Sequence, residues 1–477
     1  MQEDAARAAG NHALDEVAQL IQSGQWAQAR TRCEELVAAA PQDADALAML
    51  GRIAMGQYRW EDAIAAYDRV LRMRVDPWTL GNIGVCHWKL GNLGEAEYCL
   101  RGAIEIKPDF TRAHVSLANV LHGLRRFDDA LAQLAAAETI DAEDHQVAMR
   151  RGCALAALGR YDEAQQMFAH SVHLAGRFSY PRLVAFDRAM FDAVTTADEA
   201  VPPPRIVLQA GAQDGGFRYV VLISCNPPYV RKYGFPFIRS FAQHGGGASL
   251  PHRGPGASLP HRDPGASLLH RGPGASLLHL HIYDPDESVV DEVASLVSGV
   301  GLTRYAVTTE DNPFPAHETK QRKAYYACGR LVHLPYWLDL YRRPLLSLDV
   351  DFVVENALDA LVDAAQGCDL GLNPRDPVDS PWLDIIANII VANPTPAARS
   401  YFVAVKNYAL TYLRREREAW LVDQSALYCV LRMMERFAAP PSVAWIPADK
   451  QTCLWHIGHA YDHLLDDPRY RKYADAP

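Results

Sequence analysis

The sequence predicts two parts of different fold class, an α-solenoid followed by an α/β domain. Three observations lead to this prediction: small residues recur at a fixed step in the first part, short apolar segments alternate with helical ones in the second, and a proline-rich stretch separates the two. At 477 residues the chain is also longer than a single core usually grows. More than one folding unit is therefore expected.

Small residues recur in the first part at a step of 33 or 34 residues. The two series are Gly51, Gly84, Ala118 and Gly152, and Ala29, Ala63, Ala96, Ala130 and Ala164. A loop glycine recurs in the same phase, at Gly24, Gly91 and Gly159. Small residues let two helices approach closely, while large apolar residues fill the gap to the next pair, so this period predicts stacked helix pairs.

The pattern resembles the tetratricopeptide-repeat (TPR) family over residues 10–178, as five helix-turn-helix units. With one further solvating helix, we expect the solenoid to span residues 10–195. The resemblance implies a surface that binds a peptide or a partner protein, but a fold alone does not fix a ligand. A structural or dimerising role is left open.

Composition excludes several classes of protein. The net charge of −10 argues against a general affinity for nucleic acid. We expect no membrane span, because no stretch reaches about 18 uncharged apolar residues, and no export signal, because the first residues are acids and alanines. The nine cysteines are scattered without a C-x-x-C pair, which favours reduced thiols and a cytoplasmic location.

Two irregular segments interrupt the chain. The prolines at 202–204 end the helical periodicity, so residues 196–217 are predicted to be a linker. Residues 245–280 contain a nine-residue repeat rich in Gly, Pro and Ser, which predicts a surface insertion. Its evenly spaced histidines, at 252, 261, 270 and 279, are explained by tandem duplication better than by a metal site.

The remaining segment, residues 218–465, reads as an α/β domain. Apolar strands are predicted at 219–226, 279–284 and 304–308, and helices at 235–243, 287–298 and 320–341. Such alternation favours a parallel sheet, in which ligands lie at the carboxyl ends of strands.

Two carboxylates stand inside the next apolar strand, at Asp349 and Asp351 in the segment 344–354. Burying them is costly unless something pairs them, and an Mg²⁺ or Mn²⁺ ion would do so. Alternate residues of a regular strand are about 6.6 Å apart. We therefore predict either a turn at Val350 or one aspartate that acts through water or sugar contacts.

In this context the segment 326–355 resembles the GT-A nucleotide-sugar transferases, especially the glycogenin-like group. Three further segments follow in the matching order: Asn388 to Asn393, Val422 to Leu427, and Leu454 to Gly458. In the last segment the spacing is one residue shorter than in that group, and the lysine-proline-tryptophan that usually follows is absent. The resemblance covers about residues 218–460 and implies a GT-A domain.

The resemblance also implies roles for individual residues. It makes Asp351 a direct metal ligand, Asp349 a ligand or ribose contact, and His456 a third ligand. Asn388 would lie beside the donor sugar. For His456 the alternative is an ordinary hydrogen-bonded histidine.

Polar residues near the motif are candidates for other donor contacts. Asn226 follows the first strand and is a candidate contact for the base, while Lys320 and Arg330 precede the motif and are candidates for the phosphates or ribose. A solvated helix face is the alternative for the two basic residues.

Catalysis is assigned by the resemblance to Asp423 and Gln424, near the transferred sugar. An inverting enzyme would need a carboxylate base, for which Asp376 and Asp379 are further candidates. For Asp423 the alternative is a helix N-cap.

The expected function is transfer of a sugar, as in a hexosyltransferase, from a nucleotide donor such as a UDP-sugar to a protein, glycan or lipid-linked acceptor that the TPR region presents or recruits. An inactive α/β domain on a TPR scaffold is the alternative. The TPR-bearing O-GlcNAc transferase type is a third possibility, with a different catalytic fold and no D-x-D metal site.

Overall fold

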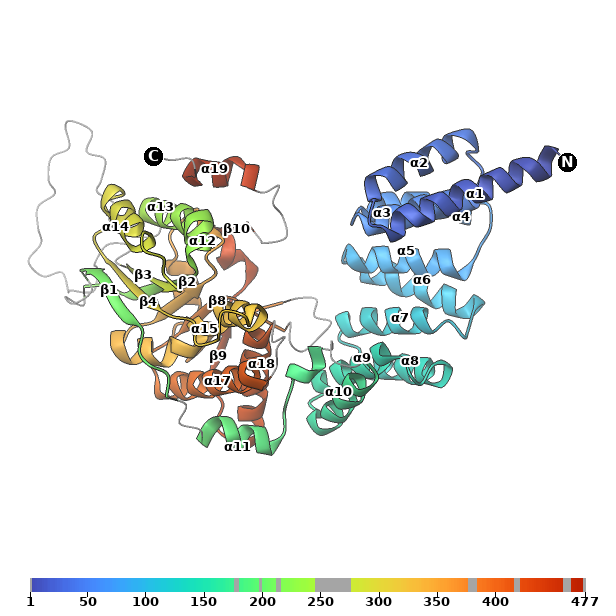
Figure 1. Ribbon diagram of the computed structural model, residues 1–477. Coiled ribbons are helices and arrows are strands. Elements are labelled where there is room, and N and C mark those ends of the chain that lie inside the picture. The colour runs from blue at the N-terminus through green and yellow to red at the C-terminus, as the bar shows by residue number, and fades with distance from the viewer. Residues whose placement is uncertain are drawn as a thin grey trace, which may run out of the picture. The chain divides into compact units, whose positions relative to one another are not determined.

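The computed structural model describes residues 2–175, 180–196, 200–211, 216–244, 276–375, 384–415, 421–457 and 465–474 (Figure 1). The chain divides into two compact units, with the boundary between Arg182 and Leu183. Residues 376–381, which the division joins to the first unit, lie outside the described ranges.

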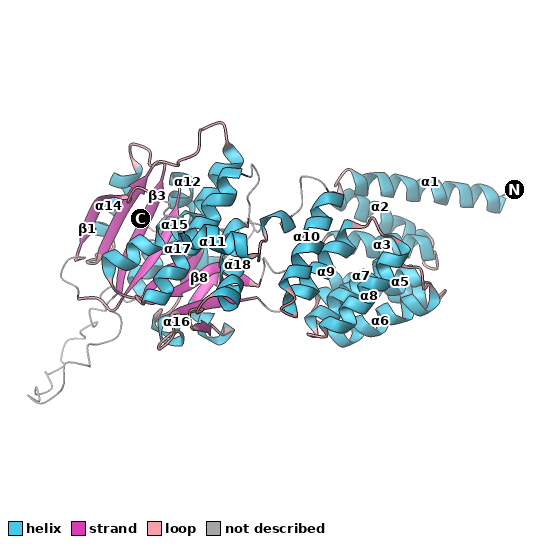
Figure 2. Cartoon of the chain, turned by 90° about the horizontal axis from the view of Figure 1, so that it is seen from below, coloured by secondary structure: helices cyan, strands magenta, loops and turns pink. Residues whose placement is uncertain are grey.

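The first unit consists of helices that pack in consecutive antiparallel pairs (Figure 2). They are α1 (Gln2–Gln22), α2 (Trp26–Ala39), α3 (Ala44–Gly56), α4 (Trp60–Leu71), α5 (Pro77–Lys89), α6 (Leu93–Ile106), α7 (Thr111–Gly123), α8 (Phe127–Ile140), α9 (His145–Ala157) and α10 (Tyr161–Ala175). The second helix of each pair contacts the first helix of the next pair. The predicted helical solenoid is confirmed.

Small residues bring the two helices of a pair together. A Cβ atom added at Gly51 would lie 2.7 Å from the ring of Tyr67. In the last pair, a Cβ atom on Gly152 would lie 2.5 Å from Phe168. Real Cβ atoms do not approach ring carbons this closely, so glycine is what allows the large side chain of the second helix to close the pair.

The turn between the helices of a pair requires a left-handed backbone. Gly24 supplies it with φ of 74°, while the corresponding residues of the second and fourth pairs are Tyr58 and Arg125, both with φ of 59°. A side chain in this region costs free energy that glycine avoids. Two of the five pairs therefore carry local backbone strain at this turn.

The second unit contains a mixed eight-stranded sheet in the order β1-β4-β3-β2-β5-β8-β7-β9. Its strands are β1 (Arg205–Ala210), β2 (Tyr219–Cys225), β3 (Ser276–Tyr283), β4 (Tyr305–Glu310), β5 (Leu345–Leu348), β7 (Leu370–Pro374), β8 (Ile385–Ala392) and β9 (Val443–Trp445). The four strands β4, β3, β2 and β5 are parallel, whereas β1 and β8 are antiparallel to their neighbours. The expected parallel arrangement therefore holds for these four neighbouring strands, and the eight-stranded sheet as a whole is mixed.

Helices cover both faces of this sheet (Figures 1 and 2). On one face lie α12 (Pro227–Tyr229), α13 (Phe235–His244), α14 (Val289–Gly299) and α19 (Pro468–Ala474). On the other lie α11 (Arg188–Thr196), α15 (Thr319–Tyr341), α17 (Pro396–Arg415) and α18 (Val422–Phe437). A short helix, α16 (Asp359–Ala364), follows the D-x-D segment.

The two faces of the sheet differ in chemistry. Because successive side chains of a strand point to opposite faces, Leu278 and Leu280 of β3 join the aliphatic core shared with α14. His279 and His281 are equally buried but face α15, where both rings contact Trp337. The sheet is thus packed by hydrocarbon on one side and partly by polar side chains on the other.

The solenoid ends earlier than predicted. Helix α11, expected within the solenoid span of 10–195 as a solvating helix, belongs to the second unit. Asn407 Nδ2 donates a hydrogen bond to the carbonyl of Val194 over 2.7 Å, and Phe191 packs against Phe437. The apolar side of α11 is covered by α17 and α18, which sequence periodicity alone does not reveal.

Three other boundaries need correction. The predicted linker, 196–217, contains strand β1, which pairs with β4. The α/β domain continues beyond residue 465, because α19 buries Tyr470 and Tyr473 and accepts a 2.9 Å hydrogen bond from Arg239 at the carbonyl of Tyr473.

The predicted insertion, 245–280, is also too long. Its last repeat copy forms the start of β3, where Ser276 to Leu280 are buried. His279 is therefore a core residue of the sheet, while residues 245–275, with the other three histidines, lie outside the described ranges.

Among the helices that the structure describes, none is long and apolar enough to cross a membrane.

Candidate functional site

The D-x-D segment lies at a sharp turn. Strand β5 ends at Leu348, Val350 and Asp351 form a turn, and the chain continues as β6 (Phe352–Val354), which leaves the main sheet. The backbone N–H of Asp349 donates to the carbonyl of Asn388 over 3.0 Å. The predicted turn at Val350 is confirmed, so the two carboxylates are not held on one face of a regular strand.

A two-stranded ribbon brings His456 to this turn. Strand β10 (Leu454–His456) runs antiparallel to β6, with His456 opposite Phe352. The next backbone N–H, of Ile457, donates to the carbonyl of Asp351 over 2.9 Å. As a result His456 Nε2 lies 3.3 Å from Asp351 Oδ2.

The three residues expected to bind a metal therefore converge. One ligand atom from each of Asp349, Asp351 and His456 lies within 4.8 Å of the other two. The Asp351 side chain is fully buried, whereas those of Asp349 and His456 are 31% and 46% exposed, so the cluster opens to solvent on one side. Two carboxylates suit Mg²⁺ or Mn²⁺, and the imidazole favours Mn²⁺.

Protonation of His456 would compete with a cation. Its hydrogen bond with Asp351 raises the pKa of His456, against the lowering effect of burial. A metal ion binds only the neutral imidazole. Cation affinity at this cluster should therefore increase with pH as His456 loses its proton.

Arg330 of α15 holds the D-x-D turn in place through an ion pair and two hydrogen bonds. This residue of α15 is 4% exposed, and its Nη1 lies 2.5 Å from Asp349 Oδ1. Nη1 also donates to the carbonyl of Leu348 over 3.1 Å, and Nη2 donates to that of Ala387 over 2.6 Å. With both terminal nitrogens engaged, Arg330 positions Asp349 rather than reaching toward phosphates, which differs from the role expected for it.

Asp423 is a buried carboxyl close to this brace. It lies in the first turn of α18, and Leu421 rather than Asp423 holds the N-cap position. Burial raises the pKa of Asp423 to about 6, and the charge of Asp349 adds to the effect, while Arg330 opposes it. A carboxyl with this pKa can hold or release a proton near neutral pH.

Gln424 follows on the same helix turn. Its Oε1 is buried and has no hydrogen-bond partner among the described residues. An unsatisfied buried acceptor costs free energy. The Oε1 atom of Gln424 could therefore accept a hydrogen bond from a bound ligand.

Asn388 belongs to a chain of amides beside the turn. Its Oδ1 accepts a 2.8 Å hydrogen bond from Asn373 Nδ2, and Asn373 Oδ1 accepts one of 2.8 Å from Gln451. Sequence reasoning missed Asn373 and Gln451, since a lone amide carries no motif.

Two expected contacts are placed differently. Asn226 follows β2 directly and caps α12, where its Oδ1 accepts a 3.4 Å hydrogen bond from the backbone N–H of Tyr229. Lys320 is exposed in the first turn of α15. At a rise of 1.5 Å per residue it lies about 15 Å along the helix from Arg330, so the two are not brought together. Asp376 and Asp379 lie outside the described residues.

The position of the cluster in the sheet is informative. From β2 the chain adds β3 and β4 on one side, and then crosses to add β5 on the other. Ligands of such sheets bind outside the carboxyl ends of the strands where the order reverses. Asn226 follows β2 and Asp349 follows β5, so the candidate site lies at this switch point.

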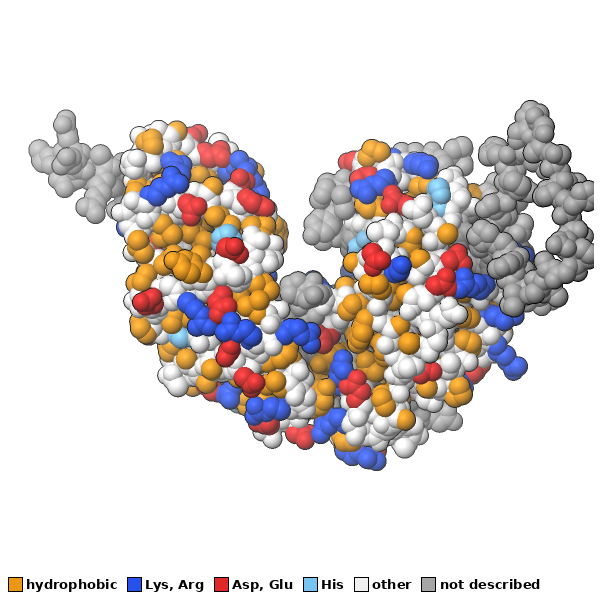
Figure 3. Space-filling model, turned by 180° about the vertical axis from the view of Figure 1, so that it is seen from behind, with side chains coloured by type: hydrophobic (Ala, Val, Ile, Leu, Met, Phe, Trp, Pro, Cys, Tyr) orange, Lys and Arg blue, Asp and Glu red, His pale blue; other side chains and the backbone are white. Residues whose placement is uncertain are grey.

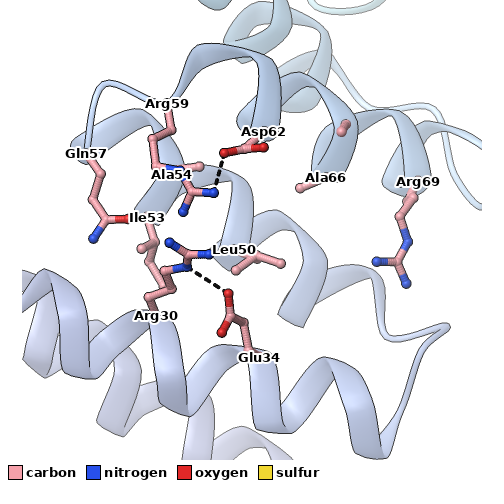
Figure 4. Close-up of a pocket in the computed structure, with 11 residues that line it drawn as sticks. Arg30, Glu34, Leu50, Ile53, Ala54, Gln57, Arg59, Asp62, Ala66 and Arg69 are labelled. Carbon is pink, nitrogen blue, oxygen red and sulfur yellow. Dashed lines mark hydrogen bonds and ion pairs between the residues drawn. The ribbon is translucent and has the colours of Figure 1, made fainter.

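The first unit has a separate pocket on α2, α3 and α4 (Figure 4). Its volume is about 240 Å³, and arginines at 30, 59 and 69 line it together with Leu50 and Ile53. Arg30 pairs with Glu34 at 2.7 Å, and Arg59 pairs with Asp62. Charges of both signs are interspersed on the surface seen in Figure 3.

Comparisons with known proteins recognise the first unit. A tetratricopeptide-repeat family model matches residues 20–78, and a second matches residues 79–110. No curated protein matches the chain significantly.

Two of the similar solved structures are described as TPR proteins. YrrB, described as a TPR protein with an unusual peptide-binding site, is 18% identical over 34% of this chain and 84% of its own, with a TM-score of 0.30. TTC0263, a TPR protein of Thermus thermophilus, is 22% identical over 36% of this chain and 95% of its own, with a TM-score of 0.33. Pseudomonas aeruginosa pilF is 19% identical over 37% of this chain and 81% of its own, with a TM-score of 0.35. The two family models identify residues 20–110 as tetratricopeptide repeats.

Proposed function

We propose that the second unit is a metal-dependent glycosyltransferase domain of GT-A type, which transfers a sugar from a nucleotide-diphosphate donor. The observation that carries the proposal is the convergence of Asp349, Asp351 and His456 at the switch point of the sheet. His456 lies about a hundred positions after the two aspartates in the chain, and a turn and a dedicated ribbon unite the three.

The donor set fits a divalent cation, Mn²⁺ or Mg²⁺, held by Asp349, Asp351 and His456. A bound cation would neutralise the diphosphate and the charge that grows on it as the sugar departs. The chain itself holds this arrangement in place. Arg330 fixes Asp349, and the hydrogen bond from Ile457 to the carbonyl of Asp351 fixes the turn.

Asp423 and Gln424 are proposed to act on the sugar side. Gln424 presents an acceptor to a sugar hydroxyl, in keeping with its unpaired Oε1. Asp423 either accepts a hydroxyl hydrogen bond or, in an inverting reaction, takes the acceptor's proton. Its pKa of about 6 leaves it mostly ionised at neutral pH, as a base requires. Asn388 would lie beside the donor sugar.

The TPR region is proposed to recruit or present the acceptor, whether protein, glycan or lipid-linked. TPR surfaces commonly bind protein segments, which supports a partner that carries or delivers the acceptor. A cytoplasmic location is part of the same proposal, since all nine cysteines are free thiols.

The test is a thermal-shift screen of nucleotide sugars on the full chain, with and without Mn²⁺. We expect one donor class, with UDP-sugars the first choice, to raise the C-terminal transition only when Mn²⁺ is present. Asp351→Ala should abolish this shift and any hydrolysis or transfer of the donor, while the TPR transition stays unchanged. An exposed aspartate of the same unit, changed in Asp449→Asn, serves as the control.

Full transfer activity in Asp351→Ala would refute the metal assignment. If no nucleotide sugar binds with any cation, the alternative of a TPR scaffold with an inactive second unit is favoured. Donor binding that needs no metal would instead favour the third possibility, the TPR-bearing O-GlcNAc transferase type, which uses no D-x-D metal site.

A further inference from the structure

A second cluster of potential metal ligands lies away from the D-x-D turn, between the sheet and α15. Among the described residues, His281 of β3, Glu310 of β4 and His333 of α15 each place one ligand atom within 4.8 Å of the other two. His281 and His333 are 0% and 2% exposed, and the Glu310 side chain is 12% exposed. Buried charge of this kind needs a compensating partner.

Hydrogen bonding within the cluster is incomplete. His333 Nε2 and Glu310 Oε2 are 2.5 Å apart and form a strong pair. On the other side, His281 Nε2 lies 3.3 Å from Glu310 Oε1, but neither atom has a hydrogen-bond partner of suitable geometry among the described residues. Two buried polar atoms thus lie 3.3 Å apart. In a tetrahedral zinc site with bonds of about 2.0–2.1 Å, two ligand atoms are also about 3.3 Å apart.

The rings are also oriented as metal ligands usually are. His281 Nδ1 lies 2.8 Å from Thr308 Oγ1, so the outer nitrogen is anchored and Nε2 is turned toward Glu310. A ligating histidine almost always has such a partner on its second nitrogen. Trp337 packs against both His281 and His333, with ring centroids at 5.3 and 5.6 Å, and encloses the cluster on the helix side.

We propose that His281, Glu310 and His333 form a zinc site that ties α15 to strands β3 and β4. Two imidazoles and one carboxylate are a ligand set that proteins use for Zn²⁺ rather than for Mg²⁺. With one donor atom from each side chain, the three residues supply three of the four corners of a tetrahedral site. The short His333 to Glu310 contact must lengthen by roughly 1 Å when the ion enters, to reach the edge length of a tetrahedral site.

The site would have a consequence for the D-x-D turn. Arg330, which holds Asp349, precedes His333 by one turn of the same helix. An ion that holds His333 against the sheet would also fix the position of Arg330 relative to the D-x-D turn, because both residues belong to α15. The proposal does not depend on glycosyl transfer, because it concerns only the packing of α15.

The experiment measures metal on the full chain, purified without an immobilised-metal step. Zinc per chain is determined by elemental analysis, and Zn²⁺ affinity is determined by titration after chelation. We expect one tightly bound Zn²⁺ in the wild type, and at least roughly 100-fold weaker binding in Glu310→Gln and in His333→Gln, because loss of an outer partner alone weakens metal binding 10–100-fold. Thr308→Val, which removes that outer partner, should fall in the 10–100-fold range.

Two controls separate this site from its neighbours. His279→Gln changes a buried histidine of the same strand that hydrogen-bonds Thr308 and Tyr341 but is not a ligand, and Asp351→Asn changes the D-x-D cluster. Both should keep the zinc.

Several outcomes would overturn the proposal: a wild-type chain that binds no Zn²⁺, unchanged zinc in Glu310→Gln and His333→Gln, or loss of zinc only in Asp351→Asn. Where the ligand variants fail to fold, Co²⁺ substitution of the chelated wild type decides. The visible bands of a tetrahedral nitrogen- and oxygen-ligated centre support the site, and the spectrum of hexahydrated Co²⁺ refutes it.

Discussion

Replacing Asp423 by asparagine should stabilise the second unit while it removes the carboxylate that we propose to be catalytic. The carboxyl is buried, and its pKa rises from 3.8 to about 6 on folding. The folded state therefore prefers the protonated form, and ionisation of Asp423 destabilises it at neutral pH. Asparagine resembles the protonated carboxyl in shape and carries no charge.

The size of the effect follows from the two pKa values. One pKa unit corresponds to about 1.4 kcal/mol, so the rise of about two units corresponds to about 3 kcal/mol at about pH 8. Because the pKa is raised in the folded state, the penalty is absent below about pH 4 and grows as pH rises toward 6. At about pH 5 roughly half of it remains.

Calorimetry of the full chain in the presence of a chelator tests this reasoning. Asp423→Asn should raise the C-terminal transition by several degrees at about pH 8, and by less at about pH 5. The TPR transition is an internal reference and should not move. Asp449→Asn, at an exposed carboxylate of the same unit, should change stability by less than about 0.5 kcal/mol.

An unchanged or lowered C-terminal transition in Asp423→Asn at about pH 8 would refute the argument, since ionised Asp423 would then cost the fold nothing. The same variant should lose transfer activity if the proposed function is correct. Higher stability with lower activity is the signature of a strained catalytic group.

Three further changes test other parts of the structure. Arg330→Lys should destabilise the second unit by about 2–5 kcal/mol, because one ammonium group cannot bind a carboxylate and two carbonyls as the guanidinium does. Urea unfolding measures this loss, and an unchanged unfolding midpoint would contradict the role of Arg330 in holding the turn. Tyr58→Gly should stabilise the solenoid by about 0.5–1 kcal/mol by relieving a positive φ, visible as a higher TPR transition, whereas a lower one would show that the tyrosine ring matters more. Deletion of 247–273 removes none of the described residues, so soluble yield and both transitions should persist; insoluble protein would mean that this segment is needed for folding.

The sequence predicted the elements whose signal is local and periodic. The step of 33 or 34 residues located the helix pairs, and the contact of Gly51 with Tyr67 shows why the step carries information: each small residue faces one large residue of the next helix. The turn at Val350 was predictable from strand geometry, because two alternate residues of a straight strand stand too far apart to hold one ion.

Features that depend on tertiary partners were not predicted. Arg330 was a candidate phosphate contact, and only the structure shows that its nitrogens are engaged by Asp349 and two carbonyls. His281, Glu310 and His333 have no common motif, since they meet through a strand pairing and a helix packing against it. The start of β3 was hidden because the strand copy of the nine-residue repeat resembles the copies before it.

The two strands of the β6–β10 ribbon are synthesised at different times, because they lie far apart in the chain. Asp349 and Asp351 are synthesised about a hundred residues before His456, and the solenoid is synthesised before all of them. Since domains tend to fold as they emerge from the ribosome, the TPR helices can engage a partner while the D-x-D cluster still lacks its imidazole. A chain that stopped before residue 454 would keep the aspartates and the solenoid but not His456. Under the proposed function, such a chain would compete for partners without transferring sugar.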